Sequence, residues 1–465
     1  MSTKISTDAK REIIDDFAKA IKTASQKGSY PQKTVIDFRN DRQRGKAGER
    51  KIYLVPTSLL RFRKDNGRIA ADVLSYEKLN GRLNERHEET QTILRGFLSE
   101  IDKENNDKLK NSIKHTGQID PAIVTCDGFL INGNRRKMIL EELFTETQDK
   151  EYSTMKVVIL PGMDDEGGAP SIIEIEEIEN RYQLQKDGKS EYTNFNWAVS
   201  TQRKIKDGYS LEKQMKDDSS YAHLPTKEFQ QKVVEIKENF LFPLECVDNY
   251  LDSLGRDTLY NTIAEGRADK DGRWYSFIDY YKYVYKKLKD EKSRIKLEVE
   301  EDEVGEIEDV AFKIIRQKDF KGFMKAHVVM RKFPLILVNK QAKKELMKIA
   351  TGTVDLTSTE IKECNGDIKL IDNRWAKKNE DLIIGKVKKA IHIIEHEKET
   401  ETPLTLLIDA LKKLNHDNMI PKNLDPFKIE EAININREIQ DRAASLETEF
   451  DHLRYEFKKL TKKKK

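Results

Sequence analysis

Cysteine is scarce in this chain of 465 residues, and long uncharged apolar runs are absent. The three cysteines, Cys126, Cys246 and Cys364, lie far apart and form no Cys-x-x-Cys pair, which excludes a disulfide framework and a zinc ribbon. No stretch approaches the roughly 18 uncharged apolar residues that a membrane-spanning helix needs. The first residues alternate in charge and lack the continuous apolar region of a signal peptide. We therefore expect a cytoplasmic protein without a membrane partner.

Neither sign of charge predominates, because 85 Lys and Arg residues stand against 82 Asp and Glu residues and leave a net charge of +3. This total neither indicates nor excludes a nucleic-acid partner. Charged residues make up 36% of the chain and hydrophobic residues 37%, which favours a largely helical protein of two or three domains. Residues 298–309 are an acidic block and residues 458–465 a basic tail. A solvated linker and a frayed terminus explain both segments, although the lysines would also attract phosphates weakly.

The N-terminal third of the chain predicts an α+β domain behind a basic arm. Residues 1–47 are expected to be a flexible arm with one short helix from Glu12 to Ala24, and order is expected to begin at Lys51. Residues 48–168 are expected to form the α+β domain, because helix caps, turns and short β-branched strands alternate there. The expected elements are a helix that begins near Asp107 and ends at Gly117, strands at 122–124 and 129–131 joined by a hairpin at 127–128, a helix after Gly133, and a strand at 156–160.

Beyond residue 168 the pattern is helical almost everywhere. We predict a helical region at 169–290 with a possible helix-turn-helix, an acidic linker at 291–309, and a helical C-terminal region at 310–465. The aromatic cluster at 274–285 is typical of a core between helices. The last helix, 426–459, has apolar residues at steps of three and four, which suits either packing on its own chain or a homodimer. The C-terminal helices are also candidates for binding other proteins.

The turn at Gly133 is the strongest candidate for a binding site. A strand ends in Gly133, and Arg135 and Arg136 stand in the first turn of the next helix. Partial positive charge at a helix N-terminus disfavours arginines there unless an anion neutralises them. Backbone N–H groups and two guanidinium groups together can hold phosphates. The alternative is that one of the two arginines faces solvent.

Glu179 and Asn180 are candidate metal ligands on a later helix. A carboxylate and an amide offer the oxygen ligands that Mg²⁺ takes together with substrate phosphates. The same helix carries Glu174, Glu176 and Glu177, so an acidic exposed face explains the pattern as well.

Three segments, taken in order, resemble the ParB/sulfiredoxin-like superfamily. Residues 108–143, KLKNSIKHTGQIDPAIVTCDGFLINGNRRKMILEEL, are similar to its helix, Pro-containing strand, hairpin and Gly-x-Arg-Arg turn. Upstream, YLVPTSLLRFRKDNGRI resembles the opening strand and loop and puts Arg68 near the site. Downstream, EIEEIENRYQ resembles the Glu-Asn segment that precedes a helix-turn-helix. The resemblance covers residues 50 to about 265.

The resemblance implies a nucleotide site. Gly133, Asn134, Arg135 and Arg136 would form the turn that holds the triphosphate of CTP or ATP, with Arg68 and the Gln118 loop lining the same pocket. Glu179 and Asn180 would hold the Mg²⁺. The implied fold is an α+β ParB/sulfiredoxin-like domain followed by a mostly helical middle and C-terminal region.

The implied partner is DNA. The helix at 226–240 exposes Lys227, Gln231 and Lys237, which are suited to phosphate or base contacts. An unusually long turn, DDSSYAHLP, separates it from the helix before it, so a protein-binding or purely structural module is the alternative.

We therefore predict a ParB-like, nucleotide-responsive DNA-binding protein of a partition, mobile-element or phage-defence system. Two other classes stay open. One is an enzyme of the same fold, a slow NTPase (CTPase or ATPase), a kinase or a nuclease. The other is a helical scaffold that recruits partners and has lost the use of its nucleotide pocket.

Overall fold

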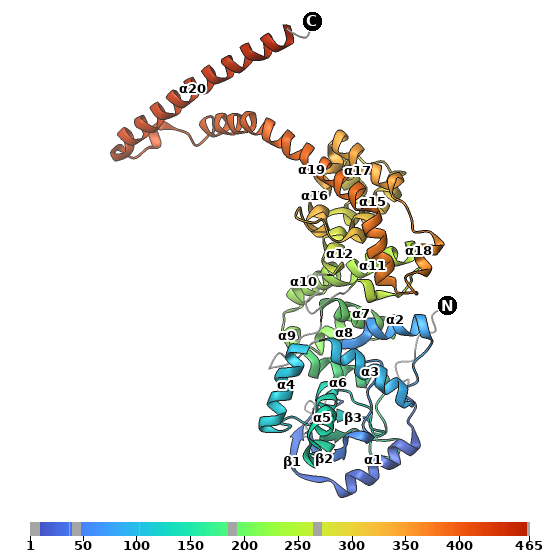
Figure 1. The fold of residues 1–465 in the computed structure, drawn as a ribbon. Coiled ribbons are helices and arrows are strands. Elements are labelled where there is room, and N and C mark those ends of the chain that lie inside the picture. Colours follow the sequence, from blue (N-terminus) through green and yellow to red (C-terminus); the bar gives the residue numbers. More distant parts are fainter. Residues whose placement is uncertain are drawn as a thin grey trace. The chain divides into compact units, whose positions relative to one another are not determined.

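The computed structural model describes residues 10–36, 38–39, 48–101, 103–184, 193–263 and 272–462. The chain divides into two compact units, residues 1–394 and residues 395–465. Most described residues are helical, and one small sheet lies in the N-terminal third (Figure 1). The predicted combination of an N-terminal α+β region with a helical remainder is therefore confirmed at this level. None of the helices in the described ranges is both long enough and apolar enough to cross a membrane.

The sheet has four strands in the order β1-β2-β4-β3. Strands β1 (Ser29–Val35) and β2 (Glu49–Pro56) are antiparallel, β2 and β4 (Thr154–Ile159) are antiparallel, and β3 (Ala122–Val124) runs parallel to β4. The expected return strand at 129–131 contributes only isolated bridges from Phe129 and Leu130. The expected strand at 156–160 is present as β4.

The N-terminal segment is part of this domain, so the prediction that order begins at Lys51 is wrong. Helix α1 (Asp15–Lys27) contains most of the expected helix, and β1 after it pairs with β2 through a bulge between Tyr30 and Lys33. The guanidinium group of Arg11 lies 2.8 Å from the buried carboxylate of Asp127. Residues 1–9, 37 and 40–47 of the expected arm lie outside the described residues.

Helices cover both faces of the sheet. Successive side chains of a strand point to opposite faces, so neighbouring residues belong to different cores. Val157 belongs to one apolar cluster with residues of α1, α3 (Glu88–Ile101), α4 (Lys103–Thr116) and α5 (Asn134–Thr147). Val158, the next residue of β4, belongs to a second cluster with Ile175 and Ile178 of α6 (Ile172–Leu184). The N-terminus of α5 lies beside Ala122, the first residue of β3.

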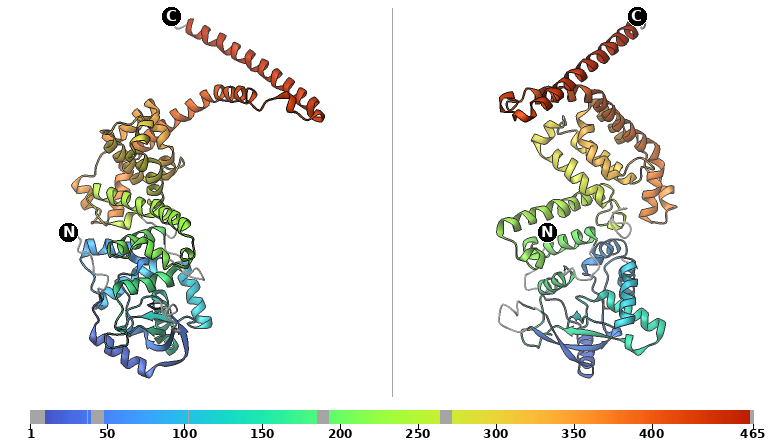
Figure 2. Two further views of the ribbon diagram at one scale, coloured as in Figure 1. Left: turned by 180° about the vertical axis from the view of Figure 1, so that it is seen from behind. Right: turned by 90° about the vertical axis from the view of Figure 1, so that its left-hand side faces the viewer.

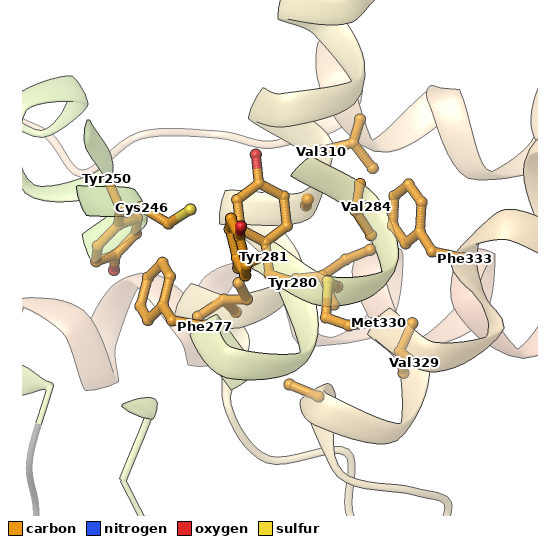
Figure 3. Close-up of a cluster of buried hydrophobic side chains, with 14 of the residues drawn as sticks. Cys246, Tyr250, Phe277, Tyr280, Tyr281, Val284, Val310, Val329, Met330 and Phe333 are labelled. Carbon is orange, nitrogen blue, oxygen red and sulfur yellow. The ribbon is translucent and has the colours of Figure 1, made fainter. Parts of the chain in front are cut away.

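The rest of the first unit is a helical body around one large apolar core. The predicted aromatic core is confirmed: Phe277, Tyr280 and Tyr281 pack with Cys246 and Tyr250 (Figure 3). The regions predicted to be helical are helical, and two helices continue into π-helical turns, η4 (Lys237–Leu241) and η6 (Tyr281–Tyr285). The helices are α2 (Ala70–Asn80), α7 (Asn194–Lys206), α8 (Leu211–Lys216), α9 (Ser219–Ala222), α10 (Thr226–Ile236), α11 (Phe242–Ser253), α12 (Trp274–Tyr280), α13 (Lys286–Lys289), α14 (Glu291–Lys296), α15 (Val304–Gln317), α16 (Ala326–Val338), α17 (Lys340–Gly352) and α18 (Ser358–Lys362).

The acidic segment 291–309 is not a linker. It contains α14 and the start of α15, and Leu297, Val299 and Ile307 are buried in the large core. Glu306 of α15 is exposed beside the buried Ile307, and Glu298, Glu300, Glu301 and Asp302 are exposed in the turns before α15.

Two long helices end the chain. Helix α19 (Ile368–Leu414) runs from the first unit into the second, and α20 (Ile429–Lys462) follows a short 3-10 turn at Pro426–Lys428. Figure 2 shows α20 as one continuous helix. The predicted terminal helix is confirmed, with its start three residues later than expected.

Candidate functional site

A cavity of about 570 Å³ lies where α4, the loop after Gly117 and the N-terminus of α5 meet. All six residues predicted to contact a nucleotide line it, although they come from three separate segments. The loop before α2 provides Arg68, the loop before β3 provides Gln118, and the start of α5 provides Gly133, Asn134, Arg135 and Arg136.

Gly133 shapes the floor of this cavity. It caps α5 in the left-handed region, with φ of 84°, a conformation that favours glycine. A Cβ atom at this position would stand 2.7 Å from the Cβ of Ala122 and 3.1 Å from the Cε of Met155. Only glycine lets the chain turn here while α5 stays close to the sheet.

The cavity wall is strongly basic. Arg68, Lys108, Arg135 and Arg136 line it, whereas Asp120 is the one acidic side chain among its lining residues. The free N–H groups and partial positive charge of the α5 N-terminus add to this potential. Such a wall attracts an anion rather than a cation.

Both arginines of the turn are held in place by neighbouring groups. The Nε of Arg135 donates to the Oδ1 of Asn106 over 2.6 Å. Arg136 donates to the backbone carbonyl of Asp120. Burial lowers the pKa of Arg136, and the nearby Asp120 carboxylate partly opposes this shift. A guanidinium group remains protonated at neutral pH even so, because its ordinary pKa is above 12.

Asn134 has an unsatisfied acceptor. Its side chain is buried, with 6% of its surface exposed, and its Oδ1 has no hydrogen-bond partner among the described residues. A buried carbonyl oxygen without a donor costs free energy. A ligand or water in the cavity that carries a donor would satisfy it.

Gln118 holds the loop and does not offer its amide to the cavity. Its Nε2 donates to the carbonyls of Asp120 and Lys156, and its Oε1 accepts from the N–H of Lys156 over 2.7 Å. The side chain thereby fixes the loop to Lys156 of β4, so its part in the site is to position the loop.

The predicted metal pair lies elsewhere, so Glu179 and Asn180 do not line the cavity. Glu179 accepts from the N–H of Gly67 and forms an ion pair with Arg63, with 1% of its side chain exposed. Asn180 is buried and donates to the carbonyl of Gln214. No group of three or more His, Cys, Asp or Glu side chains in the described ranges could hold a metal. The donor atoms are engaged, and this arrangement does not fit Mg²⁺.

Glu179 belongs to a buried charge cluster that joins three segments. Arg63 also pairs with Glu176, and Glu176 contacts Arg203 and Lys204 of α7. Burial alone would raise the pKa of Glu176, but the charges of Lys204, Arg203 and Arg63 lower it to about 2. The cluster fastens α6 and α7 to the loop that carries Arg63 and Arg68.

Helix α4 contributes to the cavity, which the sequence motifs around Gly133 do not indicate. Five of its residues line the cavity: Asn105, Lys108, Leu109, Ser112 and Ile113. Their spacing of three and four residues is that of one helix face, so the helical period could have identified them once the Gly133 turn was placed opposite. Ile119 and Tyr182 add apolar and aromatic surface, and the Ile119 side chain is 73% exposed.

The predicted DNA-binding residues lie on α10 and the π-helical turn after it. Lys227 and Gln231 are exposed, whereas Lys237 is half-buried and lies 3.7 Å from Glu212 of α8. Helices α8 and α10 share a small apolar core that includes Leu211, Met215, Phe229 and Val233. The exposed face of α10 also carries Glu228 and Glu235, so its charge is nearly balanced.

No family model matches this chain, and neither the curated proteins nor the solved structures contain a significantly similar one.

Proposed function

We propose that the basic cavity binds the phosphate groups of a nucleoside triphosphate, and that the chain is a ParB-like, nucleotide-responsive DNA-binding protein. The observation that carries the proposal is the convergence of Gly133, Arg135 and Arg136 with Arg68 and Lys108 on one cavity at a helix N-terminus. Backbone N–H groups and guanidinium groups bind phosphate oxygens with strong, charge-assisted hydrogen bonds.

The size and composition of the cavity suit a nucleotide. Its volume of about 570 Å³ lies within the usual range for small-molecule sites. The phosphates would lie at the α5 N-terminus, and the base would lie against Ile119 and Tyr182, which also line the cavity. An exposed isoleucine beside a basic wall is the kind of surface that a base covers.

Binding is favoured over catalysis. Asp120 is the one carboxylate among the lining residues, and its own backbone carbonyl holds Arg136. A hydrolase would need a base that activates water or a metal that polarises the phosphate. Glu179 supplies neither in this arrangement, because Arg63 and the N–H of Gly67 occupy its carboxylate.

Calorimetric titration of the full chain with CTP, ATP, GTP and UTP, with and without Mg²⁺, tests the nucleotide site. We expect at least one triphosphate to bind and Arg135→Ala to weaken binding at least tenfold, since it removes a charge-assisted contact. Arg86→Ala is the matched control, because Arg86 lies on the same domain, is exposed and pairs with Glu12 outside the cavity. The proposal fails if no triphosphate binds, or if both variants bind like the wild type.

The DNA-binding part of the proposal rests on α10 and its contact with α8. A gel shift on random duplex at about 50 mM and about 200 mM salt tests it, because phosphate contacts lose affinity steeply with salt. The double variant Lys227→Ala with Gln231→Ala should weaken the shift, and Lys33→Ala on β1 should not. A scaffold without DNA affinity would give no shift at either salt concentration.

A further inference from the structure

The second unit has no core of its own. Among its described side chains, at residues 395–397 and 402–459, none is buried, and only Ala432 and Leu446 are half-buried. Helices of this kind owe most of their stability in proteins to the packing of an apolar face. Large apolar side chains are instead exposed along both helices, among them Leu404, Leu407, Leu411, Ile429, Ile439, Phe450, Leu453 and Phe457.

Most of the large apolar residues of α20 follow a heptad, whereas Ile433 and Ile435 lie beside the core rows at positions e and g. With Ile429 assigned to position a, the first core row contains Ile429, Asn436, Ala443, Phe450 and Phe457, and the d row contains Ala432, Ile439, Leu446 and Leu453. Asn436 is the one polar residue in these rows. Heptads sustained over four repeats are the signature of a coiled coil, and a helix that packs on a globular surface has no need of the exact period of 3.5.

We propose that α20 forms a parallel, in-register, two-stranded coiled coil with α20 of a second copy of this chain. The proposal does not depend on the nucleotide site. The proposed partner is a second copy of this chain, because charged residues beside the core rows would meet residues of opposite charge on an identical helix.

In a parallel pair, each g residue faces the e residue five positions later on the other helix. Arg442 at g would face Glu447 of the second copy, and Glu449 at g would face Arg454. Both contacts are attractive and occur twice in a symmetric dimer. Within one chain, Arg442 lies 3.2 Å from Glu449, so the same side chains are already gathered along one edge of the helix.

Asn436 selects the orientation. In a parallel, in-register pair it meets the Asn436 of the second copy, and the two amides can hydrogen-bond to each other. An antiparallel pair that covers the whole helix would set Asn436 opposite an apolar residue of the other half. Its amide would then be buried without a partner, which is costly.

Cysteine cross-linking of the full chain tests both the dimer and its orientation. Leu453 at d would lie next to Leu453 of the second copy only in a parallel, in-register pair. We expect Leu453→Cys, in a Cys126→Ser background, to give a disulfide-linked dimer under mild oxidation. The two remaining cysteines, Cys246 and Cys364, are buried.

Tyr455→Cys is the matched control, because Tyr455 lies at position f, two residues away and facing outward from the proposed core. It should cross-link at least tenfold less than Leu453→Cys. Light scattering of the wild-type chain should give twice the mass of one chain. A monomeric mass, equal cross-linking by both variants, or a dimer in which the Leu453→Cys variant does not cross-link would each overturn the proposal.

Charge reversal gives a second test that does not depend on oxidation. Arg442→Glu would face Glu447 of the second copy and should weaken dimerisation roughly tenfold, measured by sedimentation. The double variant Arg442→Glu with Glu447→Arg should restore it. Failure of the second change to rescue the first would contradict the parallel pairing.

Discussion

Gly133 lies so close to Ala122 that a Cβ atom added to Gly133 would stand 2.7 Å from the Cβ of Ala122. This contact joins the start of α5 to the start of β3, and the basic cavity lies directly beside it. The backbone at Gly133 is left-handed, so the site depends on glycine both for its conformation and for its space.

Gly133→Ala should destabilise the chain by about 3 kcal/mol, because it adds left-handed backbone strain to a steric overlap. Gly117→Ala is the matched control. Gly117 is also left-handed, but the nearest atom to its added Cβ is 3.7 Å away. Gly117→Ala should lower the free energy of unfolding by only about 1 kcal/mol. Urea denaturation of both variants measures the difference, and equal losses would contradict the role of the Ala122 contact.

The Gly133 turn is predictable from the sequence because its signals are local. The glycine, the two arginines and the strand before them lie within a few residues of one another, and short-range turn chemistry places them. The ion pair of Glu179 is not predictable from the sequence because its partner Arg63 is 116 residues away. A carboxylate available to a metal and one buried against arginine look identical in a single sequence.

Two other differences have the same kind of cause. Strand β1 was missed because Pro31 and a bulge interrupt its alternation, and the strand is recognisable only through its pairing with β2. The segment 291–309 was mistaken for a linker because its acidic residues outnumber the buried Leu297, Val299 and Ile307. Tertiary packing decided both cases.

Glu176→Gln should destabilise the chain by about 3 kcal/mol at pH 7, because it leaves Arg63, Arg203 and Lys204 short of a counter-charge. The pKa of Glu176 is lowered from 4.5 to about 2 in the fold. Its ionised form therefore stabilises the fold above pH 4.5, and this contribution is lost as the pH falls towards 2. Free energies of unfolding at pH 7 and pH 3 measure the change.

The difference in the free energy of unfolding between wild type and Glu176→Gln should therefore be smaller at pH 3 than at pH 7. Glu100→Gln, at an exposed position of α3, is the control and should differ little from wild type at either pH. If this difference were as large at pH 3 as at pH 7, the ionised carboxylate would not be what stabilises the cluster.

Asp72→Asn should stabilise the chain at neutral pH. Burial raises the pKa of Asp72 from 3.8 to about 6, although Lys369 partly opposes this shift. A raised pKa means that the fold favours the protonated acid, so stability falls as the pH rises from about 4 to 6. Relative to wild type, the free energy of unfolding of the variant should be higher by on the order of 2 kcal/mol at pH 7 and unchanged at pH 3.5. Thermal unfolding of Asp72→Asn and of Asp107→Asn, an exposed control, tests this; an equal gain in both would contradict it.

Asn134→Asp should separate stability from binding. A carboxylate in the first turn of α5 interacts favourably with the helix dipole and with Arg135 and Arg136, so stability should rise by about 0.5 kcal/mol. The same charge would repel a phosphate in the cavity, so affinity for the triphosphate should fall at least tenfold.

Asn111→Asp is the matched control, because Asn111 is an exposed asparagine of α4 that does not line the cavity. It should leave the affinity unchanged. Calorimetric titration and urea denaturation of the two variants give both readouts. If Asn134→Asp lost stability and affinity together, a damaged fold would explain the loss of binding. If Asn134→Asp kept full affinity, the phosphates would have to bind away from the α5 N-terminus. A carboxylate at position 134 would repel any phosphate bound there.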